Sequence, residues 1–244
     1  MAKAKSDKRR IPVPPGVERA LDAGLDRALT IQRPVVQNYL ARARRKHPEL
    51  TPAELVEQLE KRYVAAVVGI GGASGAAAAV PGVGTAATIA SGAAEITAFV
   101  SASAMFVLAL AELHGVPVSD PEVRRALVVS VLVGESAIPV LGSAASNQAH
   151  WADVLSRSTP KDKITGINSH LGRLLLHRIG TRQGALLFGR ALPLGIGAAI
   201  GAGGNAALAR GAIAAARKAF GPAPEKFPAR VIDAPSPRGP RPHW

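Results

Sequence analysis

A long uncharged stretch in the first half of the chain constrains the fold more than any other feature. No Lys or Arg lies between Arg62 and Arg124, and no charged residue of any kind occurs in residues 64–94; Glu95 interrupts the stretch, and residues 96–111 are again uncharged. About 20 apolar residues suffice for a helix to cross a bilayer, so the stretch is long enough for two. It is rich in Ala, Gly, Ser and Thr, which bury little apolar area and weaken the drive for insertion. We expect either membrane insertion or tight association, or alternatively a buried helical hairpin in a soluble protein.

The positive charge of the chain lies at its two ends. The formal net charge of +13 over 244 residues divides into +6 for residues 1–62, −4 for residues 63–156 and +11 for residues 157–244. Basic segments beside uncharged helices favour contact with an anionic lipid surface. We therefore expect the cytoplasmic membrane as the partner, with both termini on the cytoplasmic side. A membrane protein partner or a second copy of the chain is a further possibility, whereas nucleic acid is not expected.

The composition also excludes several chemistries. The chain has no Cys and only 4% aromatic residues, which excludes thiolate catalysis, Cys-ligated zinc and an aromatic platform for single-stranded nucleic acid. The six His form no pair with metal-ligand spacing, and no complete G-x-S-x-G motif is present. Glycine patterns at Gly82 and Gly201 match the letters of a dinucleotide motif but follow no predicted strand. We expect no cofactor and no metal.

The pattern between the tails predicts helices throughout. An amphipathic stripe predicts a helix over residues 17–29, and a second helix is expected over residues 35–46. Thr51-Pro52-Ala53-Glu54 is a capping box, and further helix starts are predicted near Asp120 and Thr159. No window shows sustained alternation of polar and apolar residues. We therefore predict an all-α fold of closely packed Gly/Ala-rich helices.

The chain divides into four regions by composition. Residues 1–16 form a basic tail that we expect to be disordered, and residues 17–62 form amphipathic helices. Residues 63–220 form a Gly/Ala-rich helical core, and residues 221–244 form a Pro/Arg-rich tail that we also expect to be disordered. The core thus contains the features from which a function must be argued.

Two segments, residues 67–84 and 184–211, have a similar composition that is rich in glycine and alanine. Each contains a pair of glycines at spacing four, which allows close approach of two helices; the four glycines are Gly71, Gly75, Gly197 and Gly201. We predict that the two segments dock against each other or against a partner chain. Pro81 and Pro193 predict a turn, a kink or a re-entrant hairpin within each segment.

Three polar residues in apolar surroundings are the candidates for a specific role. Glu95 is either an ion or proton site, one half of a buried ion pair with Arg190, or a marker of a polar edge. Glu135 lies in a second apolar run, and for it too we expect either a chemical role or a place at a polar edge of the helices. Asn205 follows two glycines and is expected either to hydrogen-bond across to the first glycine-rich segment or to cap a helix.

The stretch of residues 164–183 predicts a basic helix with an imperfect apolar stripe. Arg173 lies away from the stripe, whereas Arg178 and Arg182 project near it and could extend toward lipid headgroups. These three arginines are the predicted membrane-surface residues. The alternative is an ordinary surface helix of a bundle.

The order of these features resembles the EcsC family of bacterial proteins, which its name ties to an ABC transporter system. The features are the glycine-rich segment 69–84, the acid Glu95 in an apolar helix, His114-Gly115, Asp120-Pro121-Glu122, and the segment 192–205 that ends in Asn205. The resemblance covers roughly residues 63–220. It implies a membrane-associated protein of the cell envelope.

The leading expectation is therefore a non-catalytic accessory or assembly protein associated with the bacterial membrane. One alternative is a hydrolase acting on lipid or envelope substrates, with Glu95 or Glu135 as general acid or base. A second alternative is a soluble helical protein that binds nucleic acid through its basic tails.

Overall fold

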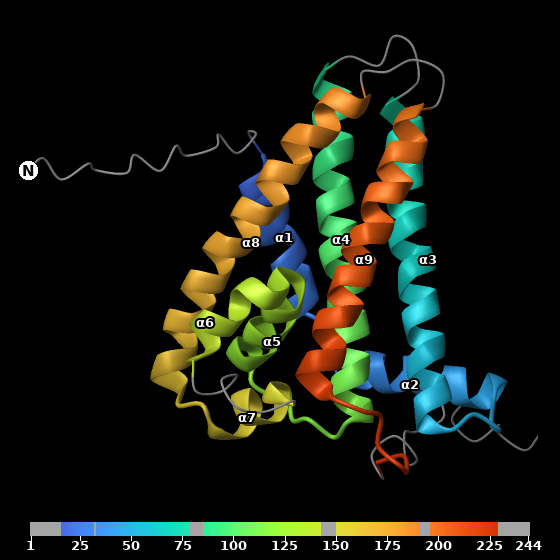
Figure 1. Ribbon diagram of the computed structural model, residues 1–244, viewed down its shortest axis with the longest axis vertical. Helices are drawn as coiled ribbons and strands as arrows, with labels where there is room; N and C mark the ends of the chain where they lie inside the picture. The colour runs from blue at the N-terminus through green and yellow to red at the C-terminus, as the bar shows by residue number, and fades with distance from the viewer. Residues whose placement is uncertain (1–15, 32, 79–84, 143–149, 191–195, 229–244) are drawn as a thin grey trace, which may run out of the picture.

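The protein is an elongated bundle of α-helices, shown as a computed structural model in Figure 1. The structure describes residues 16–31, 33–78, 85–142, 150–190 and 196–228; it does not describe the side chains of 28–29, 75–78, 85–91, 181–190 and 196–201. Within the described ranges the regular elements are α-helices and one 3₁₀ turn, with no strand. The predicted all-α class is confirmed.

The helices follow one another with short connections. In chain order they are α1 (Val17–Leu29), α2 (Arg33–Lys46), α3 (Pro52–Ala78), α4 (Thr85–Leu113), α5 (Pro121–Val133), the 3₁₀ turn η1 (Gly134–Ala137), α6 (Ile138–Leu141), α7 (Trp151–Ser158), α8 (Lys161–Arg190) and α9 (Ile196–Phe220).

Local sequence signals explain where several helices begin and end. The side chain of Thr51 accepts from the backbone N–H of Glu54, and the Glu54 carboxylate accepts in return from the backbone N–H of Thr51, 2.8 Å away. Asp120 caps α5 by accepting from the backbone N–H of Glu122 at 2.9 Å. Gly221, at a φ of +74°, closes α9 in the left-handed conformation that favours glycine. The predicted helix over residues 17–29 and the two predicted caps are confirmed.

Two long antiparallel hairpins, α3–α4 and α8–α9, form the frame of the bundle. Helix α3 packs along both α4 and α9, and α8 packs along α5 and α9. Figure 1 shows that α3 and α8 end, and α4 and α9 begin, at the same end of the long axis. We call this the hairpin end, and we call the opposite end, around α2 and α5–α7, the base. The predicted breaks at Pro81 and Pro193 lie outside the described residues, between the ends of these helices.

Helix α4 lies at the centre of the bundle and packs tightly against α1 at Gly24. A Cβ atom on Gly24 of α1 would lie 3.0 Å from the Cβ of Val100 and 3.2 Å from the Cα of Thr97. Side chains of α4 from Phe106 to Leu113 are buried in the core. The largest fully buried side chains are mostly nearer the base; among them are Leu40, Leu55, Leu113, Leu127, Leu155 and Leu171. Among the side chains that the structure describes, most of the bulkiest buried ones therefore lie nearer the base.

Two features of the base were not predicted. Sequence patterns gave no expectation of α7, whose residues Trp151 and Leu155 are buried. Residues 221–228 were assigned to the C-terminal tail, yet Phe227 packs against the core and lies 4.3 Å below the guanidinium of Arg44. The described body of the protein thus extends to Pro228, because an aromatic side chain in a proline-rich segment finds an apolar and cationic contact on α2.

Candidate functional site

A buried carboxylate joins the three helices that meet toward the hairpin end. Glu95 on α4 is 5% exposed. The hydroxyl of Ser74 on α3 donates to its Oε2 at 2.7 Å, and the Nδ2 of Asn205 on α9 donates to its Oε1 at 3.1 Å. The same Nδ2 also donates to the carbonyl of Val67 at 3.2 Å. We call Glu95, Ser74 and Asn205 the Glu95 cluster; it ties α4 to both α3 and α9.

Of the two roles predicted for Asn205, a hydrogen bond to the first glycine-rich segment and a helix cap, the structure shows the hydrogen bond. Its amide reaches across to the first glycine-rich segment through Val67, whereas a capping role would place it at a helix end rather than inside α9. Gly71 is buried on α3, the helix that packs along α9. The packing around Gly75, Gly197 and Gly201 lies outside what the structure describes, as does the side chain of Arg190, the predicted ion-pair partner of Glu95.

The space beside the Glu95 cluster is small. A pocket of about 30 Å³ is lined by Glu95, Asn205 and Arg178 together with apolar side chains of α4, α5, α8 and α9. This volume accommodates one or two water molecules. A general acid must contact its substrate, and no lipid or envelope polymer fits there. The geometry favours a structural, ion or proton role for Glu95 over hydrolysis.

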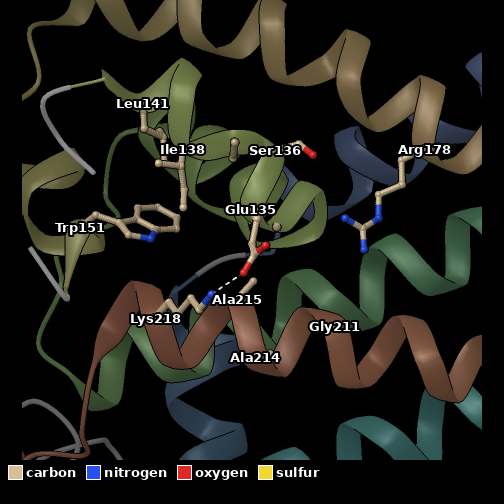
Figure 2. A pocket seen from close by; sticks show the side chains of 12 residues that line it. Glu135, Ser136, Ile138, Leu141, Trp151, Arg178, Gly211, Ala214, Ala215 and Lys218 are labelled. Atoms are coloured by element: carbon tan, nitrogen blue, oxygen red, sulfur yellow. Dashed lines mark hydrogen bonds and ion pairs between the residues drawn. The ribbon is translucent and has the colours of Figure 1, made fainter. Parts of the chain in front are cut away.

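Glu135 lies in a larger cleft at the other side of Arg178. The cleft has a volume of about 390 Å³ and lies between η1–α6, α7, α8 and α9; Figure 2 shows its lining residues. The Glu135 side chain is 78% exposed and forms an ion pair with Lys218 of α9. The hydrogen bond from Lys218 lowers the pKa of Glu135. A general acid at neutral pH needs a raised pKa, so this environment opposes that role.

The three predicted membrane-surface arginines do not share one environment. Arg173 is exposed on α8, and its guanidinium lies 3.1 Å from the Nδ1 of His170. Arg178 instead reaches the end of α5, where it donates to the carbonyl of Val133 at 2.5 Å. The Arg178 guanidinium thus has an acceptor at the end of α5, and its predicted membrane-surface role stays a prediction. The Arg182 side chain lies outside the described residues.

Two buried carboxylates near the base, each paired with an exposed arginine, were missed by the sequence reasoning. Glu112, 4% exposed, accepts from the guanidinium of Arg33 at 2.8 Å and from Gln37 at 3.0 Å. Glu60 of α3 accepts from Arg217 of α9 through two hydrogen bonds of 2.8 and 2.6 Å. The only available signal was an acid on an otherwise apolar helix face, since the partners lie far away along the chain.

The described part of the chain contains no group of three or more His, Asp or Glu side chains arranged to hold a metal ion. Comparisons of the chain with protein-family models, with curated proteins and with solved structures give no match. The resemblance to the EcsC family therefore stays a prediction.

Proposed function

We propose that the protein is a non-catalytic accessory or assembly protein of the bacterial cell envelope and that its hairpin end attaches it to the cytoplasmic membrane. The observation that carries the proposal is the uneven distribution of charge along the bundle. In α3, residues 64–78 contain no charge, and neither do residues 85–94 of α4 or 196–209 of α9. Of the helix segments that approach this end, only α8 brings cations, at Arg182 and Arg190.

The depth of the uncharged region suits one leaflet of a bilayer. Fifteen helical residues, the length of residues 64–78, extend over about 22 Å, whereas half of the hydrocarbon core measures about 15 Å. Helical backbones satisfy their own hydrogen bonds in lipid, and the exposed side chains on this part of α3 are small, as at Ala66, Gly69 and Ala73. A shallow, re-entrant attachment by two hairpins fits these features.

Complete spanning of the bilayer has less support. Among the described residues one helix, over Gly92–Leu113, is long and apolar enough to cross a membrane, and 72% of its most apolar window is buried inside the protein. A helix covered on most sides by protein is typical of a bundle core. We therefore infer that α4 acts as the central helix of the bundle, that the hairpin ends contact lipid, and that the base and both termini stay on the cytoplasmic side.

Flotation with lipid vesicles tests this attachment. Vesicles of phosphatidylcholine and phosphatidylglycerol are mixed with the wild-type chain and with Ala73→Glu and Ala53→Glu, two exposed sites on the same helix α3. We expect the wild-type chain to float and to resist a high-salt wash. We expect Ala73→Glu to lower the bound fraction about tenfold, since a carboxylate near the hairpin end opposes insertion.

Ala53→Glu is the matched control, because it adds the same charge in the first turn of α3 at the base, and it should float like the wild type. Thermal unfolding of both variants checks that the fold is intact. A chain that stays in the soluble fraction would overturn the proposal. So would vesicle binding that salt abolishes and that Ala73→Glu leaves unchanged, because the basic tails would then account for it.

A further inference from the structure

We propose that the cleft between η1–α6, α7, α8 and α9 binds a small amphipathic anion: a single apolar chain with one anionic headgroup. We call this cleft the η1–α9 cleft. It contains none of the segments through which we propose attachment to the membrane, so the two proposals stand or fall separately. The cleft volume of about 390 Å³ lies in the lower part of the range for small-molecule pockets.

The backbone around Gly134 explains why this space exists. Helix α5 stops at Gly134, whose φ of +70° favours glycine, and the chain continues as a 3₁₀ turn and the single turn of α6. This irregular connection faces α9 at three small residues, Gly211, Ala214 and Ala215, with Lys218 as the one long α9 side chain of the lining. No large apolar side chain of α9 is part of the lining, so a cleft remains between two otherwise packed elements.

The walls of the cleft are apolar at one side. Trp151 of α7 and Leu141 of α6 are 6% and 4% exposed, and both line the cleft. Ile138, also in the lining, is 40% exposed and is one of two large hydrophobic side chains that the described chain leaves exposed. Figure 2 shows the Trp151 and Ile138 side chains on the same side of the cleft. Covering Ile138 with an alkyl chain would remove apolar surface from water and favour binding.

The charged groups of the cleft favour an anionic headgroup. Lys218 and Arg178 are cations, and Glu135 is the one acid of the lining. The guanidinium of Arg178 lies close to both walls, because a Cβ on Gly134 would be 3.3 Å from its Nη1 and one on Gly211 would be 3.6 Å from its Nη2. The lining of the cleft thus contains two cations and one carboxylate.

Lys218 can exchange its partner for a ligand. In the ion pair the side chains of Lys218 and Glu135 are 61% and 78% exposed. Exposed pairs of this kind contribute little to stability, so Glu135 can turn into solvent while a ligand carboxylate or phosphate takes its place on Lys218. The headgroup then lies at Lys218, and the alkyl chain covers the apolar side of the cleft at Trp151 and Ile138, which Figure 2 shows near Lys218.

Tryptophan fluorescence provides a direct test. The chain has two tryptophans, so Trp244→Phe leaves Trp151 as the single reporter inside the cleft. The probes are decanoate, decyl phosphate and decanol, which separate a carboxylate, a phosphate and an uncharged head on the same chain. We expect saturable changes with both anions at a dissociation constant of about 1 mM or tighter, and weaker binding of decanol.

Two variants and a control locate the binding. Ala214→Leu fills the cleft and should abolish binding of all three probes, whereas Ala207→Leu, two turns earlier on the exposed face of α9, should leave it unchanged. Lys218→Gln should weaken binding of the anions about threefold to fivefold and leave decanol unaffected. Binding that Ala214→Leu does not alter, an equal preference for decanol, or no saturable change up to about 10 mM would overturn the proposal.

Discussion

The hairpin end and the base of the bundle are stabilised in different ways. At the base, buried carboxylates are matched by arginines, as in the pairs of Glu112 with Arg33 and Glu60 with Arg217, and the core contains bulky leucines. Toward the hairpin end, α3, α4 and α9 contain mostly small residues, and the Glu95 carboxylate accepts from the hydroxyl of Ser74 and the amide of Asn205. The base therefore combines large apolar side chains with ion pairs, whereas the described contacts of the Glu95 cluster are hydrogen bonds between small polar side chains and one carboxylate.

Replacing Asn205 by Leu should have the largest effect on stability. The substitution removes the amide that donates to both Glu95 and the Val67 carbonyl, in a site where Asn205 itself is 3% exposed. We expect a loss of about 2–3 kcal/mol in the free energy of unfolding, measured by urea denaturation, because buried acceptors lose their donor. Glu112→Leu at the base is the matched comparison. Its cost should be about 1 kcal/mol, since Arg33 is 40% exposed and regains water.

The account requires that Asn205→Leu lower the free energy of unfolding more than Glu112→Leu does. A larger loss for Glu112→Leu would mean that the arginine pairs of the base, rather than the Glu95 cluster, dominate the stability of the bundle. Raising the ionic strength sharpens the result, because screening should reduce the effect of Glu112→Leu and leave that of Asn205→Leu nearly unchanged.

We expect the protonation of His114 at the base to have a smaller effect on the free energy of unfolding. Burial lowers the pKa of His114 below its ordinary value of 6.5, and the nearby His150 adds to this. Hydrogen bonds of the His114 ring with the backbone of Leu110, 2.8 Å away, and of Gly221 and Pro222 offset this lowering of the pKa only in part. The unfolded chain therefore binds the proton more readily than the folded one. The contribution of neutral His114 to the stability of the fold is therefore complete above about pH 6.5, and it is lost as the pH falls through the lowered pKa.

Urea denaturation between pH 7.5 and pH 5 measures this loss. His114→Gln should flatten the decline in the free energy of unfolding over this range, whereas His170→Gln, at an exposed site on α8, should leave it as in the wild type. A decline of the same steepness in His114→Gln would show that other groups of the base cause it.

Local parts of the fold were predictable, and long-range parts were not. The amphipathic stripe of residues 17–29 and the caps at Thr51 and Asp120 are signals within one helix, and the structure agrees with them. The link from Asn205 to the first glycine-rich segment could be anticipated because a polar amide between apolar helices has few other partners. The pair of Arg33 and Glu112 joins residues 79 positions apart, and no local pattern encodes that distance.

The η1–α9 cleft is a second feature that local sequence patterns could not predict. Glu135 was recognised as a polar residue in an apolar run, but its neighbours Trp151, Arg178 and Lys218 come from three other helices. The cleft depends on the end of α5 at Gly134 and on the small residues Gly211, Ala214 and Ala215 of α9, which lie far from Gly134 along the chain. These are consequences of packing, so only the assembled bundle reveals them.

A fluorescent probe at the two ends of α3 tests the central claim most directly. The chain has no native Cys, so Ala73→Cys and Ala53→Cys each provide a single site for an environment-sensitive dye, both exposed on the same helix. On adding anionic vesicles, we predict a blue shift and quenching by lipid-bound quenchers for the dye at position 73 only. Equal responses at both positions, or a response only at position 53, would contradict attachment through the hairpin end.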